Sequence, residues 1–352
     1  MKRTISLLTA GLAASFAVAC GGGGEEVEEF PTFSLAWSEY PSWSVFGVAD
    51  ELGMIDGKAG EMGPIEAKWK VDIELKEADY DGCITNFGAG TADAACLTNM
   101  DSLAPSLGLQ AVAILPTSTS VGADALLTVG IDDVKELKGK DVLGFEGTVS
   151  EYTFVRNLQI LGENEEDYKF VMKDPATAAV GMQQGKPGYE AIVVWNPFVL
   201  DTLNKVKDAK VLFDSKSIPG EIIDMVVMSA DSLAKPGGDR FACAVIDTFY
   251  QFCRKIEDPS SREEYLVALG EKFSDLDAAS MEKVLEMTEF YDTSDEGILL
   301  FESDELVETM RKVNEFCVDH GIVGEAPKVG YGEWSQDNLG FDASYIKRVR
   351  EQ

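Results

Sequence analysis

Aromatic rings and a carboxylate gather in one short stretch near the start of the chain. The segment LAWSEYPSWSVFGVADELGMI, residues 35–55, places Trp37, Tyr40 and Trp43 around Glu39. Such rings offer flat apolar walls with hydrogen-bonding tips. A positively charged ligand would gain both cation–π contact and an ion pair there. The alternative for Trp43 is packing beneath the helix that follows.

Further polar side chains follow other apolar runs, where a strand would end and a helix would begin. Ligands in open α/β sheets bind at such ends. Asp101 could instead cap a helix, Glu146 could be a solvated loop acid, and Asp224 could line a hinge without ligand contact. The remaining candidates, which add one ring and several neutral hydrogen-bonding groups, are Asn99, Thr148, Ser150, Trp195 and Asn196.

None of these candidate loops contains Lys or Arg. A sulfonate or carboxylate site usually recruits a bidentate Arg, so this composition favours a cationic or neutral ligand. Helix N-termini can also bind an anion without a basic side chain. An anionic ligand therefore stays open as an alternative.

The elements that position these residues alternate between short apolar runs and helical patterns. This alternation predicts an α/β protein with largely parallel sheets. We expect strands over 32–36, 71–75, 94–97, 111–115, 125–129, 141–145, 169–172, 191–194, 211–214 and 225–228. Helices are expected near 45–52, 83–88, 102–107, 151–161 and 176–184, and then over 239–255, 261–273, 281–290 and 304–320.

The length of 352 residues exceeds the usual size of one hydrophobic core. We expect a first lobe from residues 31–123 and 229–324, and a second lobe from 124–228. Residues 325–352 would form a C-terminal extension that wraps the fold. The chain would cross between lobes near 121–125 and return near 224–229, and two crossings permit hinge closure around a small molecule.

The N-terminus has the pattern of an export signal. In residues 1–19 two basic residues precede an apolar run that is too short to span a membrane. The segment AVAC ends at Cys20 and resembles a bacterial lipobox, in which the thiol is lipidated; plain secretion is the alternative. Residues 20–30 are rich in Gly and Glu, which predicts a flexible linker. We therefore expect an exported, periplasmic protein anchored through Cys20.

Charge and cysteine content argue against several function classes. The formal net charge of −32 opposes binding to nucleic acid or to anionic lipid headgroups. Five cysteines follow Cys20 without a CxxC motif, so we expect mostly buried thiols and no zinc site. The single histidine, His320, stands at a helix end, and GxSxG, HExxH and P-loop motifs are absent. We expect neither catalysis nor a cofactor.

Five stretches, in order, resemble the substrate-binding proteins of ABC importers of the nitrate, taurine and aliphatic-sulfonate type. That group also includes thiamine-pyrimidine-precursor binders and members associated with urea and guanidine metabolism, and WSEYPSW with LTNMDSL is most similar to the last branch. The stretches are AWSEYPSW (36–43), GAGTADAACLTNMDSL (88–103), VKELKGKDVLGFEGTVSEY (134–152), AIVVWNPF (191–198) and PGEIIDMVVMS (219–229).

This resemblance covers about residues 33–256 and implies a two-lobed periplasmic-binding-protein fold of type II. Each lobe would hold a mostly parallel sheet flanked by helices, with a helical C-terminal region. The function implied is capture of a small nitrogen-containing compound, cationic or neutral, by a monomer that serves an ABC permease and its ATPase. The alternatives are a sulfonate- or nitrate-type anion binder, a ligand-sensing module and a hydrolase.

Overall fold

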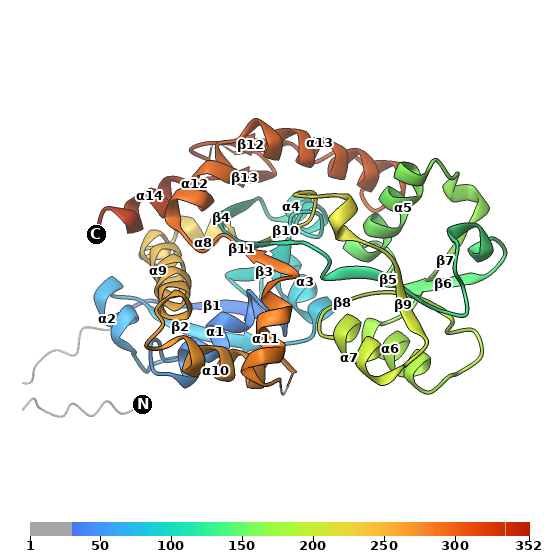
Figure 1. Ribbon diagram of the computed structural model, residues 1–352. Coiled ribbons are helices and arrows are strands. Elements are labelled where there is room, and N and C mark those ends of the chain that lie inside the picture. The colour runs from blue at the N-terminus through green and yellow to red at the C-terminus, as the bar shows by residue number, and fades with distance from the viewer. Residues whose placement is uncertain (1–29, 275, 335) are drawn as a thin grey trace, which may run out of the picture.

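The computed structural model describes residues 30–274, 276–334 and 336–352. The expected export signal, Cys20 and all but the last residue of the linker lie outside the described residues. Two sheets, each flanked by helices, form two lobes (Figure 1). The α/β fold class that the sequence predicts is confirmed.

The first lobe contains a mixed sheet with the strand order β12-β13-β4-β10-β3-β1-β2. Strand β1 pairs in parallel with β2 and β3, whereas β10 lies antiparallel between β3 and β4. Most residues of the central strands are buried, which explains their near-continuous apolar runs. The strands are β1 (Thr32–Trp37), β2 (Asp72–Glu77), β3 (Ala94–Thr98), β4 (Ala111–Ser120), β10 (Ile223–Ser229), β11 (Thr288–Phe290), β12 (Val329–Tyr331) and β13 (Leu339–Phe341).

Helices cover this sheet, and the longest of them is amphipathic. Helix α9 buries Phe241, Phe249 and Phe252 along its inner face, as its apolar periodicity predicts. The helices are α1 (Ser44–Glu51), α2 (Pro64–Trp69), α3 (Tyr80–Gly88), α4 (Leu103–Gly108), α8 (Ala230–Ala234), α9 (Gly238–Glu257), α10 (Arg262–Ser274), α11 (Ala278–Leu285), α12 (Ser294–Phe301), α13 (Asp304–Asp319) and α14 (Ser344–Arg350).

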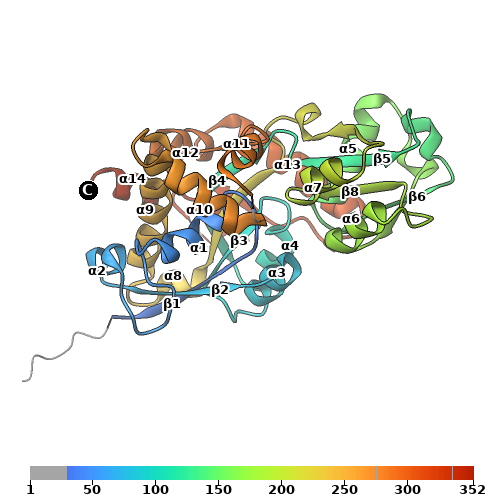
Figure 2. The same ribbon diagram turned by 60° about the horizontal axis from the view of Figure 1, so that its bottom comes forward.

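The second lobe contains a smaller mixed sheet with the order β7-β6-β8-β5-β9. Figure 2 shows it to one side of the first lobe. Strand β5 runs antiparallel to β8 and β9. Its elements are β5 (Asp124–Val129), β6 (Asp141–Gly144), α5 (Val149–Leu161), β7 (Lys169–Met172), α6 (Pro175–Gln183), β8 (Ala191–Trp195), α7 (Phe198–Lys205) and β9 (Ala209–Asp214), with short 3₁₀ turns at Val134–Leu137, Glu165–Asp167 and Ser215–Ser217.

The lobe boundaries differ from the sequence expectation. Strand β10 belongs to the first sheet, so the chain returns between lobes over residues 218–222 rather than 224–229. Residues 325–352 do not form a separate extension, because β13 pairs with β4 and α14 packs on α9. The helix expected over 281–290 ends at Leu285, and residues 288–290 pair with β4. In each case a non-local pairing outweighs the local pattern.

Helix α13 links the two lobes. It runs from the first lobe towards α5 of the second (Figure 1). The ring of Phe316 packs edge-on against Tyr152 of α5, with ring centroids 5.0 Å apart. The Nε2 atom of His320, just after α13, lies 3.3 Å from a carboxylate oxygen of Glu165.

The described cysteines match the sequence expectation, because all five are buried and free. Across the part of the chain that the structure describes, every helix is too short or too polar to cross a bilayer.

Candidate functional site

A cavity of about 670 Å³ lies where the two lobes meet, and we call it the outer chamber. The first lobe contributes the connections after β1 and β2, and the second contributes the ends of β7 and β8 with the residues that follow. Its walls are formed by Ser38, Glu39, Glu77, Ala78, Asp79, Tyr80, Asp81, Phe145, Met172, Asp174, Pro175, Ala176, Trp195 and Phe198.

A second cavity of about 20 Å³, the inner pocket, shares Tyr80 and Trp195 with the outer chamber. This volume accommodates about one water-sized group. Both lobes line the inner pocket, so its size depends on how closely they approach each other. Its walls are formed by Tyr40, Trp43, Tyr80, Thr98, Asp124, Val149, Trp195, Ile222 and Asp224.

Four of these residues form a chain of rings across the lobe junction. The ring centroids are 4.8 Å apart for Tyr40 and Trp43, 5.4 Å for Trp43 and Tyr80, and 5.8 Å for Tyr80 and Trp195. Local structure positions them: Tyr40 and Trp43 lie in the turn that opens α1, Tyr80 is the first residue of α3, and Trp195 is the last residue of β8. The rings form an aromatic box.

Three buried carboxylates surround this box. Asp101 accepts hydrogen bonds from the hydroxyls of Tyr80, at 2.7 Å, and Thr98, at 2.9 Å. Asp224 accepts one from Ser118 at 2.6 Å. Asp124, the first residue of β5, lies beside the hydroxyl of Ser120.

Burial raises the pKa of each of these carboxyl groups. The pKa of Asp101 rises to about 6 and that of Asp124 to about 7. Burial also raises the pKa of Asp224 well above its ordinary value, and the nearby negative charges of Asp124 and Asp101 raise it further. Among the described residues, neither cavity is lined by a Lys, Arg or His. The site therefore concentrates carboxyl groups that burial holds back from ionising, and no cationic side chain in its walls compensates them.

Two buried polar groups in the walls of the inner pocket lack hydrogen-bond partners within the protein. The Tyr40 hydroxyl lies near Asp224 and Thr288 but forms no well-directed hydrogen bond with either. The indole N–H of Trp43 is likewise unpaired. Unpaired buried groups also occur in the core, as at the indole N–H of Trp37, but these two line the pocket, where a ligand would supply partners.

The structure brings together several residues that the sequence singles out. Tyr40, Trp43, Trp195 and Asp224 line the inner pocket, Asp101 contacts two of its walls, and Glu39 lines the outer chamber. The helix N-cap alternative for Asp101 is not what the structure shows, because the N-cap of α4 is Ser102.

Trp37 occupies a different environment from the one expected. It is 1% exposed and lies in the core of the first lobe, beneath α1. A Cβ atom at Gly47 of α1 would lie 2.6 Å from its ring, so glycine at this position permits the close approach. The Lys272 ammonium lies 5.4 Å from the ring centroid. Trp37 thus belongs to the core rather than to the lobe junction.

The remaining candidates have local structural roles. The Asn99 carboxamide braces the return crossing, because it donates to the Glu221 carbonyl and accepts from the Ile223 amide. Thr148 caps α5, and buried Asn196 accepts a hydrogen bond from the Leu200 amide.

Two residues flank α5. Ser150 is buried near the start of the helix with an unpaired hydroxyl, one residue beyond Val149 of the inner pocket. Glu146 lies on an exposed loop, which agrees with the alternative that it is a solvated loop acid.

Sequence reasoning missed Tyr80 and Asp124. Tyr80 follows β2 and starts α3 after the N-cap Asp79, so the rule of strand end followed by helix start would have found it. Asp124 starts the first strand after the crossing, and an acidic residue at a lobe crossing was the available signal. The elements expected at 83–88 and 125–129 began too late in the chain to include these residues.

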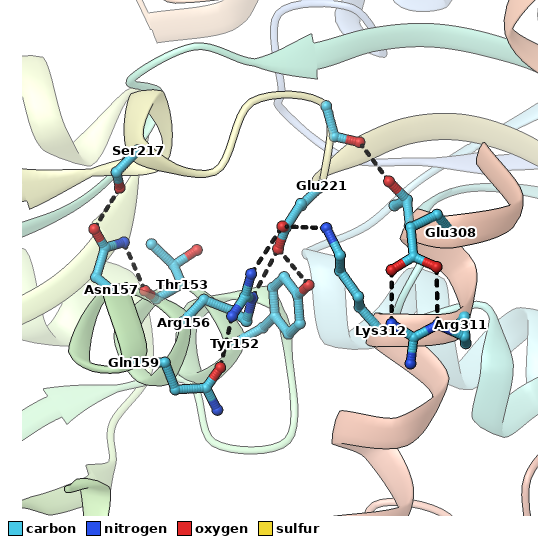
Figure 3. Close-up of polar contacts among 12 residues, drawn as sticks. Tyr152, Thr153, Arg156, Asn157, Gln159, Ser217, Glu221, Glu308, Arg311 and Lys312 are labelled. Carbon is cyan, nitrogen blue, oxygen red and sulfur yellow. Dashed lines mark hydrogen bonds and ion pairs between the residues drawn. The ribbon is translucent and has the colours of Figure 1, made fainter. Parts of the chain in front are cut away.

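A charged network fastens the return crossing. Both carboxylate oxygens of Glu221 are bonded: Oε2 accepts from Tyr152 and Arg156 of α5, and Oε1 accepts from Arg156 and from Lys312 of α13 (Figure 3). Burial alone would raise the pKa of Glu221, but these bonds lower it to about 2. The return crossing, the second lobe and α13 therefore meet at one ionised carboxylate.

No protein-family model matches this chain, and no curated protein matches it. Solved structures do. The periplasmic aliphatic sulphonate binding protein SsuA from Escherichia coli is 17% identical, with a TM-score of 0.65 over 84% of this chain and 94% of that one. The alkanesulfonate-binding protein SsuA from Xanthomonas axonopodis pv. citri, bound to MOPS, is 15% identical, with a TM-score of 0.66 over 84% and 95%.

The periplasmic nitrate-binding protein NrtA from Synechocystis PCC 6803 is 13% identical, with a TM-score of 0.56 over 82% of this chain and 86% of that one. At such identities the likeness shows the fold. It confirms at that level the resemblance that the sequence motifs indicate. The chain has the two-lobed α/β fold of the periplasmic binding proteins, in the form found in sulfonate- and nitrate-binding proteins.

Proposed function

We propose that this chain is an exported solute-binding protein that captures a small, nitrogen-containing cation between its lobes. One observation carries the proposal: Asp101, Asp124 and Asp224 surround an aromatic box whose walls contain no basic side chain among the described residues. Uncompensated buried carboxylates are costly, and a ligand cation would offset that cost. The rings would add cation–π attraction.

An anionic ligand of the kind named for the fold relatives fits these walls less well. A helix N-terminus can bind an anion without basic side chains, and α5 begins beside the inner pocket. However, the backbone amide of Val149 at this helix end already lies next to the Asp101 carboxylate and lowers its pKa, against the larger effect of burial. Helices α3, α6 and α7 begin at the outer chamber, and Asp79 and Asp174 cap the first two. An anion would therefore meet like charge at the starts of α3, α5 and α6.

The unpaired indole N–H of Trp43 adds a requirement. This group donates only, so a ligand atom that satisfies it must accept a hydrogen bond. Ligands that join an ammonium, guanidinium or amidine group to a nearby oxygen or nitrogen acceptor fit both features, and a neutral urea-like compound fits the second.

The remaining parts of the proposal concern cellular context. We propose lipidation of Cys20, a periplasmic location, a monomeric state and delivery to an ABC permease with its ATPase, on the basis of the sequence motifs and the likeness in fold. Hinge closure is supported by the two crossings and by a cavity that both lobes line. A sensory role would use the same cleft.

The hydrolase alternative has little support. The two ring nitrogens of His320, the only histidine in the chain, contact the Phe316 carbonyl and Glu165 rather than a serine hydroxyl.

A thermal-shift panel tests the proposal, because a ligand that binds the folded state raises the melting temperature by mass action. The compounds are guanidine, urea, choline-like amines, pyrimidines, taurine and nitrate. We expect guanidine or an amine to give the largest shift, and Asp224→Asn to reduce it. Glu146→Gln is the control, because Glu146 is exposed and outside both cavity walls. A shift with taurine or nitrate alone would refute the cationic preference.

A further inference from the structure

We infer that the ligand is an elongated dication, with one cationic group in the inner pocket, a second in the outer chamber and an apolar linker between them. This inference rests on the proposed function and adds the length and charge number of the ligand. The two cavities are adjacent compartments of one site, since Tyr80 and Trp195 line both.

With the lobes as they lie in the structure, the inner pocket admits only a small group. At about 20 Å³ it holds a single compact group, whereas the outer chamber has about 670 Å³. A ligand with more atoms must therefore extend past the shared rings. The unpaired Tyr40 hydroxyl, in a side chain 4% exposed, marks the inner end, where it can accept a hydrogen bond from a ligand N–H group.

The shared rings suit an apolar linker. Tyr80 meets Trp195 edge-on, and Trp195 continues to Phe145, at 6.5 Å, and Phe198, at 6.3 Å, on the outer side. Met172 also lines the outer chamber although it is 48% exposed. An alkyl chain along these side chains would remove apolar surface from water.

The outer chamber is also acidic, but its carboxylates are exposed whereas those of the inner pocket are buried. Its walls hold five carboxylates, and the residues described there include no basic side chain. The acidic residues come from both lobes and are Glu39, Glu77, Asp79, Asp81 and Asp174.

Most of these acids, Glu39 included, also interact with other groups. Glu77 lies 3.5 Å from Lys272, and Asp79 and Asp174 cap helices α3 and α6. Closure still brings like charge from two lobes to one chamber. A second ligand cation would offset that repulsion.

Calorimetric titration of the full mature chain with two matched series tests the inference. The probes are primary n-alkylamines and α,ω-diaminoalkanes of equal carbon number. We expect diamines to bind about tenfold more tightly than monoamines once the linker is long enough to pass the shared rings, because the second ammonium gains an ion pair and cation–π contact.

Variants separate the two compartments. The double substitution Asp81→Asn and Asp174→Asn should remove the diamine advantage, because it weakens diamine binding far more than monoamine binding. Both side chains are exposed, and Asn retains the N-cap at Asp174. Asp224→Asn should weaken both series, and Glu146→Gln should change neither.

The outcomes distinguish this inference from the proposed function. Equal affinity for matched monoamines and diamines in the wild type would overturn the elongated dication and leave a small cation as the ligand. An undiminished diamine advantage in the double variant would also overturn it. Failure of both series to bind would also overturn the elongated dication, and the response to guanidine in the thermal-shift panel would then decide separately whether the ligand is a cation.

Discussion

Acidification of the ligand-free protein from about pH 8 to about pH 5 should raise its free energy of unfolding, because buried carboxyl groups around the inner pocket take up protons. Burial raises the pKa of Asp101 from 3.8 to about 6 and that of Asp124 from 3.8 to about 7. A carboxyl whose pKa is raised by folding binds protons more tightly in the folded state. Ionisation of such a carboxyl therefore lowers the free energy of unfolding above the folded pKa, and this loss of stability diminishes as the pH falls towards about 4.

The magnitude follows from these pKa values. Proton uptake by the two carboxyls between about pH 8 and about pH 5 adds about 4 kcal/mol to the free energy of unfolding, with about two thirds from Asp124. Glu221 has a pKa lowered to about 2, so its contribution is lost only as the pH falls below about 4 and does not change in this window. A cationic ligand should reverse the trend, because it favours the ionised carboxylates.

Urea unfolding at a series of pH values, with and without saturating ligand, measures this dependence. Asp292 also titrates near pH 6, with its pKa raised by burial and by Glu296, so a variant within the site is needed. Asp224, whose pKa burial raises well above 3.8, contributes in the same direction. Asp124→Asn should therefore remove about two thirds of the part that Asp101 and Asp124 contribute, Asp224→Asn should remove the further part, and Asp292→Asn should leave both in place. Identical slopes for the wild type and Asp124→Asn would refute the reasoning.

Two further predictions concern the rings and the hinge. Trp195→Ala should weaken ligand binding by about 10- to 100-fold in calorimetry with little change in melting temperature. Trp37→Ala should instead lower the free energy of unfolding by about 3–5 kcal/mol and leave the ligand affinity of the folded fraction unchanged. The reverse pattern would contradict the two placements. Glu221→Gln should lower the free energy of unfolding by about 1–3 kcal/mol and increase the radius of gyration in X-ray scattering. Glu308→Gln is the control and should do neither, because it alters an exposed pair with Arg311 on α13 (Figure 3). Equal scattering from both variants would show that the Glu221 network does not hold the lobes together.

Local signals located much of the candidate site. Each of Tyr40, Trp43, Asp101 and Trp195 follows or ends a strand, where the next few residues start a helix or turn. That pattern depends on neighbours within a few positions, so it can be read from the chain. The five buried thiols follow in the same way, because cysteines inside apolar runs enter the core with them.

Tertiary structure decided which of these side chains meet. Trp37 and Trp195 each end a strand, yet one lies under α1 and the other lines the lobe junction. Which way a ring points depends on the pleat of its strand and on what packs against it, and neither is a local property.

The sequence by itself determined the α/β class, the two lobes and the loops that carry the acids and rings, because hydrophobic periodicity and turn chemistry are local. Only the tertiary structure placed β10 between β3 and β4, added β13 to the same sheet and brought Glu221 to α5 and α13. Strand pairing and lobe packing join residues that are distant in the chain. Their free energy depends on the completed fold rather than on any one segment.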